Sequence, residues 1–101
     1  MRKIEIPSSY LRYLKKVKKY PKFDNDKYND IIRMIVDKQK IPPQYKDHPL
    51  AKHSPDKYKG CRDVHISPNI VLVYRATDDA VQLVAIGSHQ DLGLTEDFNG
   101  D

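Results

Sequence analysis

Two strand-forming segments joined by a tight turn limit the possible folds of this chain more than any other part of its sequence. Residues 61–66 alternate so that Asp63 and His65 share one face of a strand. The turn at 67–69 reads Ser-Pro-Asn, in which proline fixes φ and asparagine tolerates the left-handed conformation. Residues 70–74 are almost wholly apolar, as is typical of a strand covered on both faces. The sequence therefore predicts a central hairpin that presents an Asp/His pair rigidly on one surface.

Length and cysteine content bound the class of protein. At 101 residues the chain is expected to form a single domain over 1–94, followed by a polar, acidic tail at 95–101. Cys61 is the only cysteine, so no internal disulfide can form, which favours a reducing cytoplasm. There is no signal-peptide-like start and no apolar run near the ~20 residues that span a bilayer. We therefore expect a cytoplasmic protein without a membrane partner.

Positive charge is concentrated at the start of the chain. Residues 1–22 contain eight Lys or Arg and one acid, a local charge of +7 in a chain whose net charge is +4. Such asymmetry indicates a polyanion or an acidic protein as partner, although a solvated helix face explains the charge pattern equally well. The basic residues of the helix expected here are Arg12, Lys15, Lys16, Lys18 and Lys19.

Hydrophobic periodicity predicts a short strand at 2–6 followed by two helices. A serine at 8–9 is the expected N-cap of the first helix, which Pro21 ends. Asp24 is the expected N-cap of the second helix, which the prolines at 42–43 stop. The positions expected to be buried are Tyr10, Leu11, Leu14, Val17 and Tyr20 in the first helix and Tyr28, Ile31, Ile32, Ile35 and Val36 in the second.

The remaining elements complete an α+β fold. The polar segment 42–59 has no periodicity and is predicted to be a long loop of the kind that often carries function. A last strand at 80–86 follows the hairpin and ends just before His89. The element order predicts an N-terminal strand and two helices packed on a mainly antiparallel four-stranded sheet, β-α-α-β-β-β.

A set of short motifs in a fixed order resembles a known family. The motifs are Tyr45-Lys46-Asp47-His48-Pro49-Leu50, then Gly60-x-Arg62-Asp63-x-His65-x-x-Pro68, then the apolar strand to Tyr74, then Gly87-Ser88-His89. Together they resemble the RelE superfamily of bacterial toxins, specifically its YafQ-type branch, over residues 2–93. The order and spacing are far more specific than any one motif.

This resemblance implies a RelE-like fold and a toxin of a type II toxin–antitoxin system. It implies an mRNA interferase, a ribosome-dependent endoribonuclease that cleaves translated messenger RNA in the ribosomal A site. The reaction it implies needs no metal or cofactor, because the ribose 2′-OH attacks the adjacent phosphate. The residues at the positions of the family's active site are His48, Asp63, His65 and His89.

Two positions depart from the branch. Asn69 stands where the branch has a carboxylate, which removes a charge that could keep a histidine protonated. Gly93 stands where the branch has an aromatic residue, which is expected to stack on a base. Leu92 and Phe98 are the nearby residues that could take its place.

The chemistry can also be considered from the residues alone. Cleavage through the 2′-OH needs a base, an acid and cations that stabilise the charge on phosphorus. Histidine suits both proton-transfer roles, because its ordinary pKa is about 6.5. We expect His48 or His65 to act as the base, His89 as the acid, and Asp63 to orient or charge a neighbouring histidine. The expected phosphate-binding residues are Lys46, Lys52 and Arg75, with Lys15, Lys16, Lys18 and Lys19 on the first helix.

Simpler explanations exist for the same residues. His65 on a half-buried strand is compatible with a hydrogen-bonded core histidine, and Asp63 with a purely structural acceptor. No His-Glu-x-x-His motif or paired cysteine spacing is present, so no metal site is expected.

The expected partners follow from the resemblance and the charge. They are the ribosome, messenger RNA and a cognate acidic antitoxin, DinJ/RelB-like, that neutralises the basic surface. The toxin–antitoxin complex is expected to be hetero-oligomeric and to bind operator DNA through the antitoxin. One alternative is a non-catalytic, ParE-like toxin that inhibits DNA gyrase, which would have no need of His48, His65 and His89. The other is a catalytically weakened RNA binder with a RelE fold.

Overall fold

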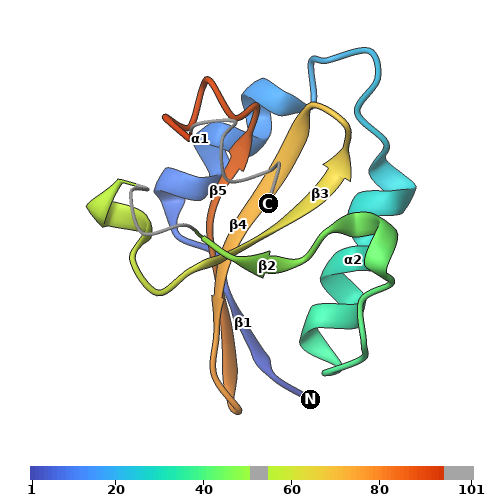
Figure 1. The fold of residues 1–101 in the computed structure, drawn as a ribbon, viewed down its shortest axis with the longest axis vertical. Coiled ribbons are helices and arrows are strands. Elements are labelled where there is room, and N and C mark those ends of the chain that lie inside the picture. The colour runs from blue at the N-terminus through green and yellow to red at the C-terminus, as the bar shows by residue number, and fades with distance from the viewer. Residues whose placement is uncertain (51–54, 95–101) are drawn as a thin grey trace.

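A computed structural model describes residues 1–50 and 55–94 of the chain (Figure 1). The expected tail at 95–101 lies outside the described residues. The regular elements are β1 (Lys3–Glu5), α1 (Ser8–Val17), α2 (Asn25–Val36), β2 (His48–Pro49), β3 (Arg62–Ser67), β4 (Ile70–Ala76) and β5 (Ala80–Gly87), with single 3₁₀ turns η1 (Pro43–Tyr45) and η2 (Asp56–Tyr58). No helix in the described ranges is long and apolar enough to cross a membrane.

The strands form one sheet in the order β1-β5-β4-β3-β2. β1 runs parallel to β5, and the other neighbours are antiparallel. The predicted α+β architecture is confirmed, but the sheet has five strands instead of the expected four. The additional strand is β2, inside the segment that was predicted to be a loop. Two residues are too few to produce a period in the sequence, so only pairing with β3 reveals this strand.

The predicted central hairpin is confirmed as β3 and β4. β4 is covered on both faces, because Leu72 packs in one apolar cluster while Val71 and Val73 pack in another. The first cluster contains the buried residues of α1 and α2. The second lies on the opposite face and is closed by Tyr58 and by residues after β5, including Leu92. Asp63 and His65 therefore lie on the sheet face that the helices do not cover.

The first helix differs from its prediction at both ends. Pro7, and not a serine, occupies the N-cap position, and no side chain caps the helix. The helix ends at Val17, and the chain continues to Tyr20 in tight turns. Leu11 is 49% exposed and not buried as expected. Its side chain is about 100° around the helix from that of Tyr10, which is buried against the sheet.

The second helix begins as predicted, since the Asp24 side chain accepts a hydrogen bond of 3.0 Å from the Lys27 backbone N–H. Of its expected stripe, Tyr28, Ile31 and Ile35 are buried, while the other two members are partly buried. The helix ends at Val36, before the prolines that were expected to stop it. The reversal occurs at Lys38, whose φ of 60° is left-handed.

Candidate active site

Pairing between β2 and β3 places His48 opposite Asp63. The His48 Nδ1 atom lies 2.9 Å from Asp63 Oδ1 and 2.6 Å from the backbone oxygen of Lys46. Two acceptors at Nδ1 favour the tautomer with its proton on that atom, and the Nε2 atom of the same ring is buried. The Asp63 contact is short enough for an ion pair, but the hydrogen bond is made to the carbonyl, so Asp63 acts on His48 mainly through charge.

Asp63 is a buried acid with little support from hydrogen bonds. Its side chain is 0% exposed, and in the described part of the chain neither carboxylate oxygen accepts a hydrogen bond. Burial raises the pKa of the Asp63 carboxyl to about 6, and Asp47 adds to the rise, while His48 and Arg62 oppose it. Keeping this carboxylate charged is costly, because desolvation favours its neutral form.

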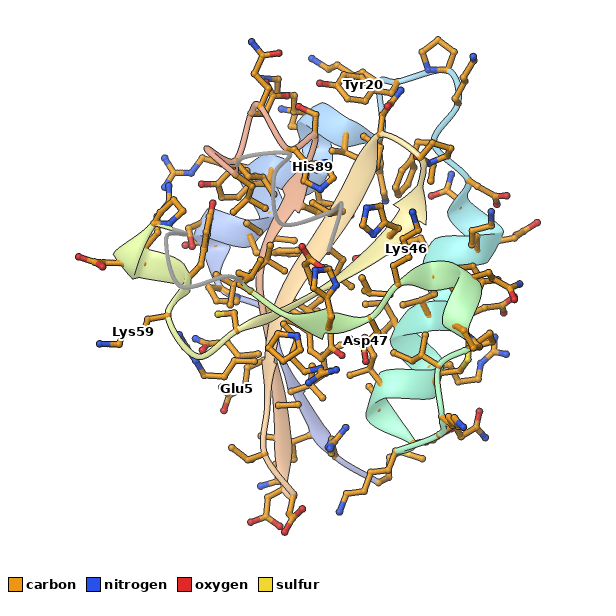
Figure 2. The ribbon with its side chains drawn as sticks, viewed as in Figure 1. Glu5, Tyr20, Lys46, Asp47, Lys59 and His89 are labelled. Carbon is orange, nitrogen blue, oxygen red and sulfur yellow. The ribbon has the colours of Figure 1, made fainter. Side chains whose placement is uncertain are left out.

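His65 and His89 form a second pair. His65 lies two residues after Asp63 on the same strand face, and His89 lies two residues beyond the end of β5 (Figure 2). Their ring centroids are 5.3 Å apart, with the rings inclined at 45°. Burial lowers the pKa of His65 to about 4, and the charges of His89 and Lys46 contribute to the fall. His65 is therefore neutral at pH 7 in the free protein.

A pocket of about 820 Å³ opens beside this second pair. Its volume lies within the range of small-ligand sites. Lys27 and Lys46 bring positive charge to its wall, and Tyr45 brings an aromatic ring. His48 and Asp63 are not in this wall, so the first pair lies beside the pocket. The titratable and polar side chains of the wall include Lys27, Tyr45, Lys46, His65, Asn69 and His89.

Only some of the predicted phosphate-binding residues lie near this pocket. Lys46 does, because it follows η1 in a left-handed conformation with φ 54°. Arg75 instead donates hydrogen bonds of 3.0 Å to Gln82 Oε1 and to the Lys59 carbonyl. It lies on β4 four residues from the partner of His65, roughly 13 Å along the strand. Lys52 lies outside the described residues.

The basic helix α1 packs along β5, on the face opposite the histidines. Its one ion pair within the described part of the chain joins Lys16 Nζ to Asp91 Oδ2 at 3.4 Å, two residues after His89. The other lysines of α1 and of the turn after it are exposed. The structure thus brings the end of this helix to the margin of the site. The residues concerned are Lys15, Lys16, Lys18 and Lys19.

Sequence reasoning missed the roles of two residues around the site. Lys27 lies in the second helix and lines the pocket, but nothing in its sequence spacing indicated a site. Asp47 was part of a motif without a role. It accepts hydrogen bonds from Tyr74 Oη at 2.6 Å and from Arg62 Nε at 3.3 Å. This cluster lies on the far side of β3 from His65, in agreement with the alternation.

The structure shows the surroundings of Asn69 and Gly93, the two positions that depart from the pattern of the YafQ-type branch. Asn69 is exposed in the wall of the pocket, where it adds no charge. Gly93 has a φ of 74°, a conformation that strains any residue with a Cβ, so an aromatic residue does not suit this turn. Leu92 is 2% exposed and packs against Gly87, so it cannot replace the missing aromatic side chain. Phe98 lies outside the described residues.

No group of three or more His, Cys, Asp or Glu side chains within 1–50 and 55–94 is arranged to hold a metal ion. The described residues bring together a histidine–carboxylate pair, a pair of imidazoles and two lysines that line the adjacent pocket. Such a set can move protons and bind anions.

Comparisons with known proteins agree on one family. The family model for the bacterial YafQ toxin of type II toxin–antitoxin systems matches residues 2–94. The mRNA interferase toxin YafQ of Escherichia coli K12 is 32% identical over 92 residues, which cover 90% of this chain and 95% of that protein. The E. coli DinJ–YafQ complex matches with a TM-score of 0.76 and 30% identity, over 91% of this chain and 98% of that chain. A copper-bound mutant toxin from Helicobacter pylori matches with a TM-score of 0.77 and 33% identity, over 91% and 99%.

Proposed function

The chain belongs to the YafQ family of toxins from bacterial type II toxin–antitoxin systems, and on that premise we propose that it is an mRNA interferase. The substrate is messenger RNA during translation in the ribosomal A site. The reaction is attack of a ribose 2′-OH on the adjacent phosphodiester, without a metal. It leaves a 2′,3′-cyclic phosphate on one fragment and a free 5′-OH on the other. The four side chains proposed to do the chemistry are His48, Asp63, His65 and His89.

One observation carries the proposal. Two pairs, His48 with Asp63 and His65 with His89, lie on the sheet face that the helices leave uncovered, and Lys46 is next to both. A structural role in the core would explain a single buried histidine. It would not explain why Lys46 and the neutral ring of His65 line the same pocket. An entering phosphate would find positive charge to stabilise it and proton carriers within the same region.

The charges favour one assignment of proton roles. His48 is the proposed base, because the Asp63 carboxylate stabilises the imidazolium that forms when the ring takes the 2′-OH proton. Its Nε2 atom is buried in the free protein, so we also propose that the contacts that cover it are displaced when RNA binds. His89 is the proposed acid that protonates the departing 5′ oxygen. His65 holds protons weakly in the free protein, so it is proposed to orient the phosphate and the neighbouring His89. Each well-placed acid or base contributes about 10²–10⁴ in rate.

The partners follow from the same premise. The E. coli relative forms a complex with DinJ, and we propose that this chain binds a cognate acidic antitoxin in a hetero-oligomer. Operator DNA is then bound through the antitoxin, as part of the same proposal. Free toxin is proposed to act in the cytoplasm, where the lysines of α1 contact ribosomal RNA.

The test is to induce this chain in growing bacteria and map the 5′ ends of cellular messages. The comparison is the triple variant His48→Ala/His65→Ala/His89→Ala, with circular dichroism and antitoxin binding as controls for folding. Translation-dependent cuts that the triple variant lacks are the expected result. Growth arrest that survives the triple variant without new message ends would overturn the proposal and make DNA gyrase the next target to test.

A further inference from the structure

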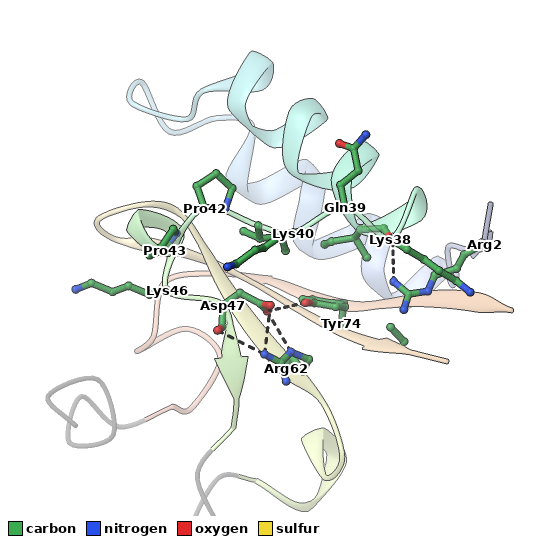
Figure 3. A pocket seen from close by; sticks show the side chains of 13 residues that line it. Arg2, Lys38, Gln39, Lys40, Pro42, Pro43, Lys46, Asp47, Arg62 and Tyr74 are labelled. Carbon is green, nitrogen blue, oxygen red and sulfur yellow. Dashed lines mark hydrogen bonds and ion pairs between the residues drawn. The ribbon is translucent and has the colours of Figure 1, made fainter. Parts of the chain in front are cut away.

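A second pocket, of about 580 Å³, lies between the C-terminal end of α2 and the strands β3 and β4 (Figure 3). It is distinct from the histidine pocket, but Lys46 belongs to the walls of both. Its charged lining is strongly unbalanced, with five cationic side chains and one acid. These residues are Arg2, Lys38, Lys40, Lys46, Arg62 and Asp47.

The one acid in this pocket is already neutralised. Asp47 forms an ion pair of 3.2 Å with Arg62 Nη2 and accepts a hydrogen bond of 2.6 Å from Tyr74 Oη. Arg2, Lys38 and Lys40 have no ion pair with any described acid. The pocket therefore keeps an excess of positive charge that the described residues do not balance.

Of the cationic side chains in this pocket, Arg2 has a structural role, because it caps the C-terminal end of α2. The Arg2 guanidinium donates hydrogen bonds of 2.7 Å to the Ile35 carbonyl at the end of α2 and of 2.7 Å to the Thr77 carbonyl. These bonds fix the plane of Arg2, and Nη2 is not used in them. Lys38 and Lys40 make no side-chain hydrogen bond with a described residue. In Figure 3, Lys40 projects across the pocket and Lys38 lies beside Arg2. The side chains of Lys38 and Lys40 therefore line the pocket without a hydrogen bond or ion pair to any described residue.

We propose that this pocket binds a phosphate of the RNA backbone at a position outside the one that is cleaved. The inference rests on the proposed nuclease function and extends it with a second contact to the substrate. A strand whose scissile phosphate lies beside His65 and His89 would pass Lys46 on its way to Lys38 and Lys40. Lysine ammonium groups bind phosphate as point charges, and the fixed Arg2 offers a planar donor.

The pocket is suited to the backbone and not to a base. Its aromatic residue, Tyr74, is 3% exposed and uses its hydroxyl on Asp47, so no aromatic face is available for stacking. Contacts of this kind position a nucleic acid without reading its sequence. An acidic protein segment would find the same charges. The shared wall at Lys46 favours RNA, because a single strand that follows this residue could contact both pockets.

The test measures binding of a short single-stranded RNA with 2′-O-methyl riboses, which cannot be cleaved, as a function of salt. The variant is Lys38→Gln/Lys40→Gln, and the matched control is Lys57→Gln/Lys59→Gln, which removes the same charge. Lys57 and Lys59 are absent from the wall of the pocket, and Lys59 points outward on the η2 side of the molecule (Figure 2). For single strands, each lost phosphate contact lowers the slope of log K against log salt by about 0.7.

We expect the pocket variant to lose about 0.7–1.4 of this slope and the control to lose clearly less. Equal losses in the two variants would overturn the inference. Unchanged RNA binding together with weaker binding of the purified antitoxin would also overturn it, and would assign the pocket to an acidic peptide. Because the RNA probe cannot be cut, this result is independent of the message mapping. Failure of the nuclease proposal and failure of this inference are therefore distinguishable.

Discussion

Replacement of Asp63 by asparagine is predicted to stabilise the fold while it weakens the activity. The carboxyl pKa rises from its ordinary 3.8 to about 6 in the folded protein because the side chain is buried. A difference of this size corresponds to about 3 kcal/mol. A raised pKa stabilises the folded state at low pH, and this contribution is lost as the pH rises from about 4 through about 6. Asparagine does not titrate and is not subject to this loss.

The assay is urea unfolding of both proteins across that pH range. The free energy of unfolding of the Asp63→Asn variant, relative to that of the unsubstituted protein, should grow by about 3 kcal/mol between pH 3 and pH 7. With a urea slope of about 1–3 kcal/mol/M, this is a relative shift of roughly 1–3 M in the midpoint. The same variant should cleave RNA more slowly, because His48 loses the charge that supports its imidazolium.

A neighbouring acid supplies the control, with the opposite sign. Asp47→Asn removes a carboxylate that accepts hydrogen bonds from Arg62 and Tyr74, so it should destabilise the fold by about 1–3 kcal/mol at pH 7. A stability difference for Asp63→Asn that stays constant with pH would refute the reasoning. It would mean that Asp63 is not held charged in a desolvated position.

Three further perturbations test other contacts. Tyr74→Phe should lower the free energy of unfolding by about 1–2 kcal/mol in a urea titration, and a neutral result would show that the bond to Asp47 contributes nothing. Gly93→Ala should lower the melting temperature and reduce the free energy of unfolding by about 1 kcal/mol, since φ is 74° at this position. A more stable variant would show that the turn does not need this left-handed conformation. The ring of His65 should titrate near pH 4 by NMR, and its pKa should rise in His89→Ala, which removes a charge that lowers it. An unchanged value would exclude coupling of the two rings.

Local patterns were sufficient for most of the fold. Alternation and the Ser-Pro-Asn turn predicted β3 and β4, and the cap at Asp24 predicted the start of α2. The predictions failed where the local preference did not decide the structure. Serine is a common N-cap residue, but here Ser8 is already the first residue of the helix. The residue before it, Pro7, takes the N-cap position, and its carbonyl accepts hydrogen bonds from the first turn. β2 was missed because pairing with β3, and not propensity, makes those two residues a strand.

In the candidate site, too, local contacts could be predicted from the sequence and long-range contacts could not. Neighbours on one strand, such as Asp63 and His65, could be placed together from their spacing alone, since the period of a strand is local. The contact of His48 with Asp63 joins residues 15 positions apart, and His65 meets His89 across the ends of two strands. Their order in the chain is compatible with proximity but does not specify it.

The α+β class, the double-sided cover of β4 and the residue types available for proton transfer were all present in the local sequence. Which of these residues meet, the engagement of Arg75 away from the histidines, and the position of Lys46 between two pockets emerged only from the folded chain. Secondary structure follows from interactions over a few residues, so a short window of sequence is enough to predict it. The burial and the pKa of a side chain depend instead on groups that only long-range packing brings near it.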